Sequence, residues 1–276
     1  MKQGWTCIAC ALALCCAMGC AGQAKQTEEA PSAPVVMQTE QAEEPQAPQF
    51  TAIPAAETAS PAPDEAGERN DAFRAALRAL LDTHVLPDGT DAGYQEGMSD
   101  EGNQFAVYDV DGDGRDELVV LYTTTYMAGQ TAGVYAFDGA GKPLRAKLTE
   151  YPLLTFYSNG VIQAGWSHNQ GLAGEFWPYT LYRYDAAADA YAPVGMADAW
   201  EKAFAPVNFN GEAFPDALDA QGAGVVYYLI PGGEYQEVPP SSAAEYEAWR
   251  AQALAGAAEI ALPLLPLTDE SIETLR

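Results

Sequence analysis

The feature that most constrains the fold is a short acidic segment, rich in glycine, between two β-prone runs. Residues 109–118 read DVDGDGRDEL, with Phe-Ala-Val-Tyr before them and Val-Val-Leu-Tyr after them. Runs of β-branched and aromatic residues favour strands, whereas Asp together with Gly favours tight turns. The segment therefore predicts two strands joined by a loop, and not the two helices that flank the loop of an EF-hand.

The spacing of the acidic residues in this loop suits a hard cation. Alternate carboxylates match positions one, three and five of an EF-hand-type loop, and Gly114 matches position six, where the chain turns sharply. Position twelve is Val120, so the closing carboxylate is expected at position nine. The expected ligands are Asp109, Asp111, Asp113, the backbone carbonyl of Arg115, and Glu117. Calcium accepts such irregular oxygen sets, and we expect Ca²⁺ here; the alternative is an acidic turn that binds nothing.

A short apolar leader begins the chain. Residues 5–18 are apolar and too few to span a bilayer comfortably, which is typical of a signal peptide. Gly19 and Cys20 resemble a bacterial lipobox, although Ala17 stands where leucine is usual. We expect residues 1–19 to be removed and Cys20 to be lipidated, which would anchor the protein to the bacterial cell membrane on its extracytoplasmic side. Plain secretion and an uncleaved anchor are the alternatives.

The positions of the cysteines exclude two classes of protein. All five lie within the first twenty residues, so a chain cut before Cys20 keeps one thiol. Internal disulfides and cysteine-ligated zinc are thereby excluded from the mature chain.

With this leader, the loop resembles a known kind of protein. DVDGDGRDEL is similar to the strand-loop-strand DxDGDGxxEL loops of FG-GAP and related calcium-binding repeats. In a single copy behind a lipoprotein leader, it resembles uncharacterised surface lipoproteins of gut-type bacteria. The specific likeness covers about ten residues. It implies a structural calcium site and no particular activity.

Composition divides the rest of the chain in two. After Cys20, residues 21–69 are mostly Ala, Pro, Glu, Gln and Thr, which predicts a disordered linker. Residues 70–276 carry the apolar periodicity of one globular domain.

Within that domain the pattern predicts an α+β fold that is mainly antiparallel sheet, with an N-terminal helix and C-terminal helices. Asn70 is expected to cap the first helix, and Asn159-Gly160 is expected to join a hairpin. Strands are expected at 105–108, 118–122, 134–137, 155–157, 161–163, 179–184, 191–194 and 225–230, and further helices at 198–204 and 242–254.

Charge and motifs limit the function. A formal net charge of -26 repels phosphate backbones, so we expect no nucleic-acid partner. No nucleophile elbow, zincin motif or phosphate-binding loop occurs in the sequence, so no catalytic residue is assigned.

A glycine-rich stretch with aromatic residues is the expected ligand site. Trp166, His168 and Trp177 could form a platform for a cell-wall or extracellular glycan or peptide, although aromatic residues in strands often face a core. We expect a binding module of unknown specificity; an extracytoplasmic hydrolase with carboxylate chemistry is the alternative.

The lipid anchor gives the first prediction. Cys20→Ser removes the thiol that would receive the lipid, so the variant should leave the membrane fraction or fail to mature. Fractionation of cells fed a labelled fatty acid measures both effects. A variant that fractionates like wild type and keeps the label would contradict the assignment.

Overall fold

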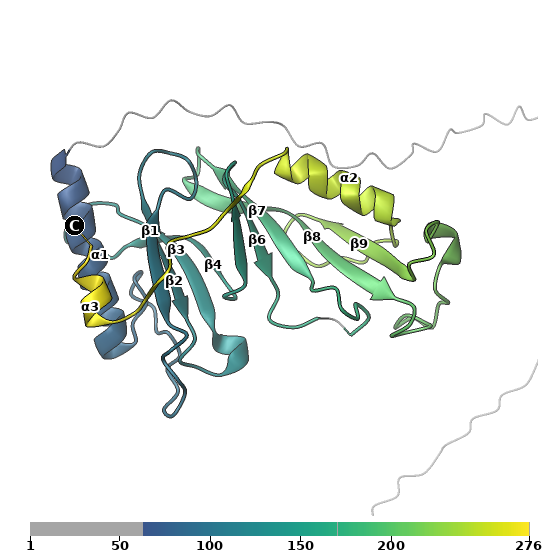
Figure 1. Ribbon diagram of the computed structural model, residues 1–276, viewed down its shortest axis with the longest axis horizontal. Coiled ribbons are helices and arrows are strands. Elements are labelled where there is room, and N and C mark those ends of the chain that lie inside the picture. The colour runs from purple at the N-terminus through teal and green to yellow at the C-terminus, as the bar shows by residue number, and fades with distance from the viewer. Residues whose placement is uncertain (1–62, 170, 276) are drawn as a thin grey trace, which may run out of the picture. The chain divides into compact units, whose positions relative to one another are not determined.

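The computed structural model describes residues 63–169 and 171–275, which form two antiparallel sheets with helices packed on them (Figure 1). The α+β prediction, mainly antiparallel sheet with an N-terminal helix and C-terminal helices, is confirmed. The predicted signal peptide, Cys20 and the predicted linker up to residue 62 lie outside the described residues. Among the described residues, no helix is both long and apolar enough to cross a membrane.

The first sheet has the strand order β11-β1-β2-β3-β4. Its strands are β1 (Gln104–Tyr108), β2 (Glu117–Tyr122), β3 (Thr131–Ala136), β4 (Arg145–Glu150) and β11 (Leu265–Pro266). The second sheet has the order β10-β5-β6-β7-β8-β9. Its strands are β5 (Leu154–Tyr157), β6 (Val161–Gly165), β7 (Tyr179–Asp185), β8 (Ala190–Glu201), β9 (Val225–Pro231) and β10 (Glu259–Ile260). The helices are α1 (Pro63–Thr83), α2 (Ala243–Leu254), α3 (Asp269–Ile272) and the short 3-10 turns η1 (Met127–Gly129) and η2 (Asp216–Leu218).

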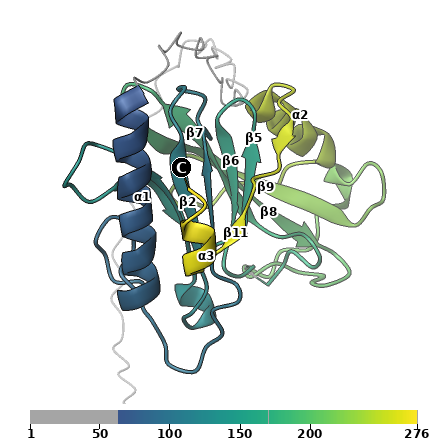
Figure 2. The ribbon, with the colours of Figure 1, turned by 60° about the vertical axis from the view of Figure 1, so that its left-hand side comes forward.

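Helix α1 covers one face of the first sheet (Figure 2). Phe73 and Leu77 recur at helical spacing and are fully buried in the cluster that contains Tyr122 of β2. The helix begins at Pro63, so the prediction that Asn70 caps it and that the linker runs to residue 69 is wrong. Proline is tolerated in the first helical turn because the amide it lacks would have no partner there.

The second sheet packs against the other face of the first. Side chains alternate along each strand, so neighbours in sequence face opposite ways. Val119 of β2 joins a core cluster with Phe156 and Ile162 of the second sheet. Tyr157 and Val161 join a separate cluster on the far side of that sheet.

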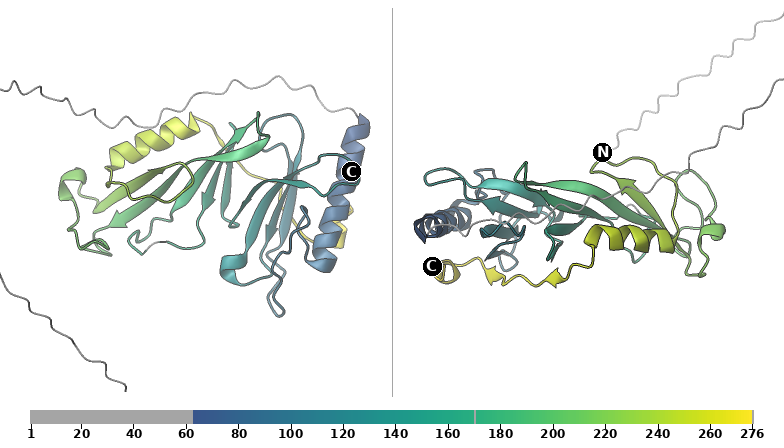
Figure 3. Two further views of the ribbon diagram at one scale, coloured as in Figure 1. Left: turned by 180° about the vertical axis from the view of Figure 1, so that it is seen from behind. Right: turned by 90° about the horizontal axis from the view of Figure 1, so that it is seen from above.

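Helix α2 covers that far side, where Figure 3 shows it beside β8 and β9. Tyr246 and Trp249 are its buried aromatic residues. Ser242 accepts from the Glu245 amide and Glu245 accepts from the Ser242 amide, and these two bonds form a capping box. The helix ends at Leu254, as predicted, and Ala255 after it has a left-handed conformation.

The predicted hairpin is present, but one predicted helix is a strand. Thr155 pairs with Gln163 across the Asn159-Gly160 turn. Residues 198–201 belong to β8 instead of the helix expected at 198–204. Trp200 is buried there against Val226 of the neighbouring strand, so sheet pairing outweighs the local preference.

Gly160 provides a test of how the two sheets fit together. Its φ is +72°, and a Cβ atom there would lie 3.1 Å from the backbone oxygen of Asp111 in the acidic loop. Gly160→Ala should therefore destabilise the fold by about 1–3 kcal/mol, through both the backbone conformation and this contact. Gly232→Ala is the control, because φ is +74° and no atom lies within 4 Å. If urea unfolding shows that both variants lose the same free energy of unfolding, the contact with Asp111 contributes nothing to stability.

Candidate functional site

The acidic loop between β1 and β2 is held in shape by its own side chains. Asp109 accepts from the backbone amides of Gly112 at 2.8 Å and Gly114 at 3.0 Å. Asp111 accepts from the amide of Asp113 at 3.0 Å. Both glycines have positive φ. These bonds between side chains and backbone amides hold the carboxylates within one compact loop.

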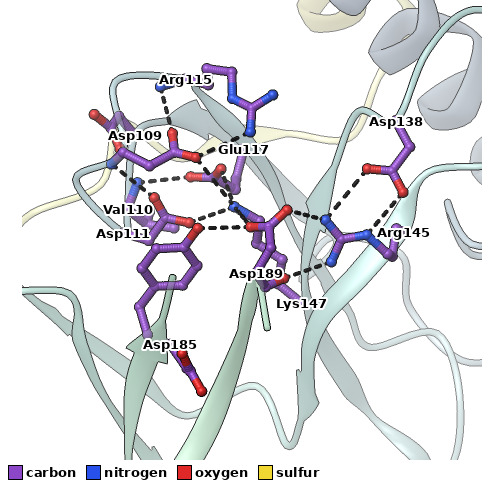
Figure 4. A network of polar contacts seen from close by, with 12 residues as sticks. Asp109, Val110, Asp111, Arg115, Glu117, Asp138, Arg145, Lys147, Asp185 and Asp189 are labelled. Carbon is purple, nitrogen blue, oxygen red and sulfur yellow. Dashed lines mark hydrogen bonds and ion pairs between the residues drawn. The ribbon is translucent and has the colours of Figure 1, made fainter. Parts of the chain in front are cut away.

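A lysine from the edge strand of the first sheet reaches into this loop. Lys147 lies on β4, and its side chain is only 1% exposed. Its Nζ lies 2.5 Å from Asp111 Oδ2, 2.9 Å from Glu117 Oε1 and 3.0 Å from Asp189 Oδ1. Asp113 Oδ2 is farther away, at 4.0 Å. The ammonium therefore touches two of the predicted metal ligands and one carboxylate that the sequence did not indicate (Figure 4).

Asp189 connects the loop to the second sheet. It lies in the turn between β7 and β8 with φ +47°, a conformation that is uncommon for residues other than glycine. Its Oδ1 accepts from the Tyr184 hydroxyl at 2.8 Å, and its backbone oxygen accepts from Arg145 at 2.6 Å. Arg145 also pairs with Asp138 at 2.9 Å. Charges from both sheets thus meet at one edge.

Burial dominates the electrostatics of this cluster. It raises the pKa of Glu117 from 4.5 to about 8, even though Lys147 acts to lower it. Burial also raises the pKa of Asp111. Burial alone would lower the pKa of Lys147, but Glu117 and Asp111 outweigh it, so the pKa of Lys147 is raised. The lysine therefore carries its charge at neutral pH.

The carboxylates are close enough to hold a metal ion. Oxygens of Asp109, Asp111 and Glu117 lie within 4.8 Å of one another, and so do oxygens of Asp111, Asp113 and Asp189. Hard oxygen donors of this kind suit a hard divalent cation. The donor set therefore fits a metal, but the Lys147 ammonium already contacts oxygens from both groups.

A buried tyrosine lies near enough to the same cluster to be affected by its charges. The Tyr191 side chain lies on β8, the residue is 8% exposed, and its hydroxyl has no hydrogen-bond partner among the described residues. Burial and the nearby charges of Asp111 and Glu117 raise its pKa. A buried hydroxyl beside carboxylates normally finds a partner, so an additional polar species would satisfy it.

The space beside the ammonium is small. A cavity of about 20 Å³ is lined by Glu117, Asp138, Lys147 and Asp189, among others. That volume is close to what a single water molecule or ion needs. It is far below the several hundred Å³ of an ordinary substrate pocket.

A larger hollow contains two of the three predicted ligand-binding residues. Its volume is about 510 Å³, and Gln130, Glu150, Tyr151, Trp166 and His168 are among its lining residues. It lies where the chain segments that follow β4 and β6 meet the segment around η1. Sequence reasoning did not indicate the residues that η1 and β4 contribute.

The predicted aromatic platform is therefore partly assembled. Trp166 donates from Nε1 to Thr180 at 3.0 Å, which fixes its ring, and His168 contacts Ser167 at 3.0 Å. Trp177 is 44% exposed and donates to the Trp166 backbone oxygen at 2.7 Å, but it does not line the hollow.

Sequence reasoning missed Lys147 and Asp189. Apolar and polar residues alternate over Arg145–Glu150, and this pattern favours a strand, although no strand was predicted there. A lone lysine and a turn aspartate carry no motif, and only the packing of the sheets brings them to the loop.

Comparison of the chain with protein-family models, curated proteins and solved structures gives no match.

The raised pKa of Glu117 predicts a pH effect on stability. The folded chain holds this proton more tightly than the unfolded chain, so stability from Glu117 is full below pH 4.5 and is lost as pH rises toward about 8. Glu117→Gln cannot ionise. In chelator, the stability of the variant relative to wild type should rise by on the order of a few kcal/mol from about pH 5 to about pH 9. Urea unfolding at both pH values measures this, and a constant difference would contradict it.

Proposed function

We propose that this protein is a ligand-binding module, tethered by Cys20 to the outer side of a bacterial membrane and supported by a cation in its acidic loop. The observation that carries the binding proposal is the hollow that places Trp166 and His168 beside Tyr151. Aromatic rings next to convergent polar groups are typical of binding sites.

The lining of the hollow favours a carbohydrate. Flat rings such as Trp166 stack on the apolar faces of sugars, and the Gln130 amide and Glu150 carboxylate offer hydrogen bonds to hydroxyl groups. A volume of about 510 Å³ suits a ligand of a few sugar rings. Because the chain has a net charge of -26, a neutral or amine-bearing oligosaccharide is favoured over an acidic one.

The arrangement of carboxylates favours binding over hydrolysis. Glycoside hydrolysis commonly uses two carboxyl groups on either side of the scissile bond. Glu150 is the one carboxylate among the lining residues of the hollow, and it accepts a hydrogen bond from Tyr182. Glu117 and Asp189 lie together, but their cavity of about 20 Å³ has no room for a substrate.

Calcium is the proposed divalent ion of the loop. It tolerates irregular sets of six to eight oxygens, whereas magnesium requires an octahedron. An extracellular module would need a dissociation constant of only about 10⁻⁴ to 10⁻³ M. Asp109, Asp111, Asp113 and Glu117, with the carbonyl of Arg115, would hold the ion, which would stabilise the strands beside the loop.

Removal of the Trp166 ring tests the binding proposal. A panel of neutral, amine-bearing and acidic oligosaccharides, with cell-wall fragments and peptides, is screened against the full chain and against Trp166→Ala. Loss of the stacking ring should weaken binding of a sugar ligand by about 1–3 kcal/mol, or roughly 10- to 100-fold. Phe209→Ala is the matched control, because Phe209 is 74% exposed and does not line the hollow. A panel without any ligand, or equal affinity in both variants, would contradict the proposal.

A further inference from the structure

The acidic loop already contacts a cation supplied by the chain itself. The Lys147 ammonium lies 2.5 Å from Asp111 and 2.9 Å from Glu117, both of which are proposed calcium ligands. All three side chains are almost completely buried. Carboxylates buried in this way are costly unless a positive charge compensates them. The lysine supplies that charge in the absence of a metal.

One lysine does not satisfy the whole cluster. Asp113 lies 4.0 Å from the ammonium, and Asp109 uses both carboxylate oxygens on backbone amides of the loop. The Tyr191 hydroxyl beside the cluster is more than nine-tenths buried and has no partner among the described residues. This orphan hydroxyl is a second, independent indication that the cluster can take a further polar species.

We propose that Lys147 is a tethered counter-ion that competes with calcium for the oxygens of Asp111 and Glu117. This inference rests on the proposed calcium site. The loop then has two closed states, one held by the ammonium and one held by the divalent ion. Because calcium must displace a group that is attached to the chain, Lys147 lowers the apparent calcium affinity without abolishing the site.

The surroundings of Lys147 allow it to leave. It borders the cavity of about 20 Å³, which is also lined by Glu65, Asp138 and Asp189. The side chains of Glu65 and Asp138 are 47% and 39% exposed, so this side of the cluster opens toward solvent. An ammonium that moves in this direction keeps acidic neighbours and becomes accessible.

Calcium titration of two matched variants tests the competition. Lys147→Met removes the ammonium and keeps an apolar stem of similar length. Lys202→Met removes the same unit of charge at a residue that pairs with Asp216, outside the acidic cluster. Calorimetry on the full chain should give Lys147→Met a calcium dissociation constant at least about tenfold lower than wild type. Lys202→Met should change it less than about threefold.

The outcomes separate this inference from the calcium proposal. If wild type and Lys147→Met bind calcium equally well, the competition is wrong and the calcium site stands. If neither binds calcium, both are wrong. If Lys147→Met unfolds in chelator and refolds with calcium, the competition is supported, because the metal then replaces the lost ammonium.

A measurement on the wild-type chain keeps the inference testable if Lys147→Met does not fold. Acetylation by an amine-reactive reagent, read by mass spectrometry, should modify Lys147 at saturating calcium and spare it in chelator. The exposed Lys142 is the internal control and should react equally in both conditions. Equal protection of Lys147 with and without calcium, while calorimetry shows that calcium binds, would overturn the inference.

Discussion

An ammonium group buried among carboxylates joins the two sheets at one edge. Lys147 lies on β4 of the first sheet. Asp111 lies in the acidic loop, and Glu117 lies at the start of β2, which follows this loop. Asp189 lies in a turn of the second sheet. Removal of one partner from such a buried group commonly costs about 3–5 kcal/mol, because the remaining charges lose their compensation. The position of the loop, the register of β4 and the shape of the β7–β8 turn therefore depend on one another.

The same edge strand links the two candidate sites. β4 carries Lys147 into the acidic cluster, and it ends at Glu150, which borders the hollow with Trp166. β4 pairs with β3 on both sides of Lys147, where the register shifts between Val134 and Tyr135. Backbone hydrogen bonds therefore fix the strand before and after the lysine. The hollow therefore lies next to a strand held by a buried ion network, and such a support would lower the ordering cost of binding a ligand there.

Local patterns predicted most of the elements, and the failures have physical causes. The Asn159-Gly160 hairpin and the Ser242 capping box depend on residues a few positions apart, so their signals are visible in sequence. Residues 198–204 have no such constraint. Pairing with β9 and burial of Trp200 made most of them a strand. The first helix began seven residues before the predicted Asn70, since proline is compatible with a first turn.

The sequence by itself determined the acidic loop, because the hydrogen bonds within it join residues no more than seven positions apart, as between Asp109 and Gly114 or Val110 and Glu117. It also indicated Trp166 and His168 as neighbours at a possible site. Only the tertiary structure decided what compensates the charge of the loop. Lys147 is 36 residues from Asp111, and no local pattern records such a pair. Burial makes the pair necessary, and burial is a property of the packed sheets and not of the chain.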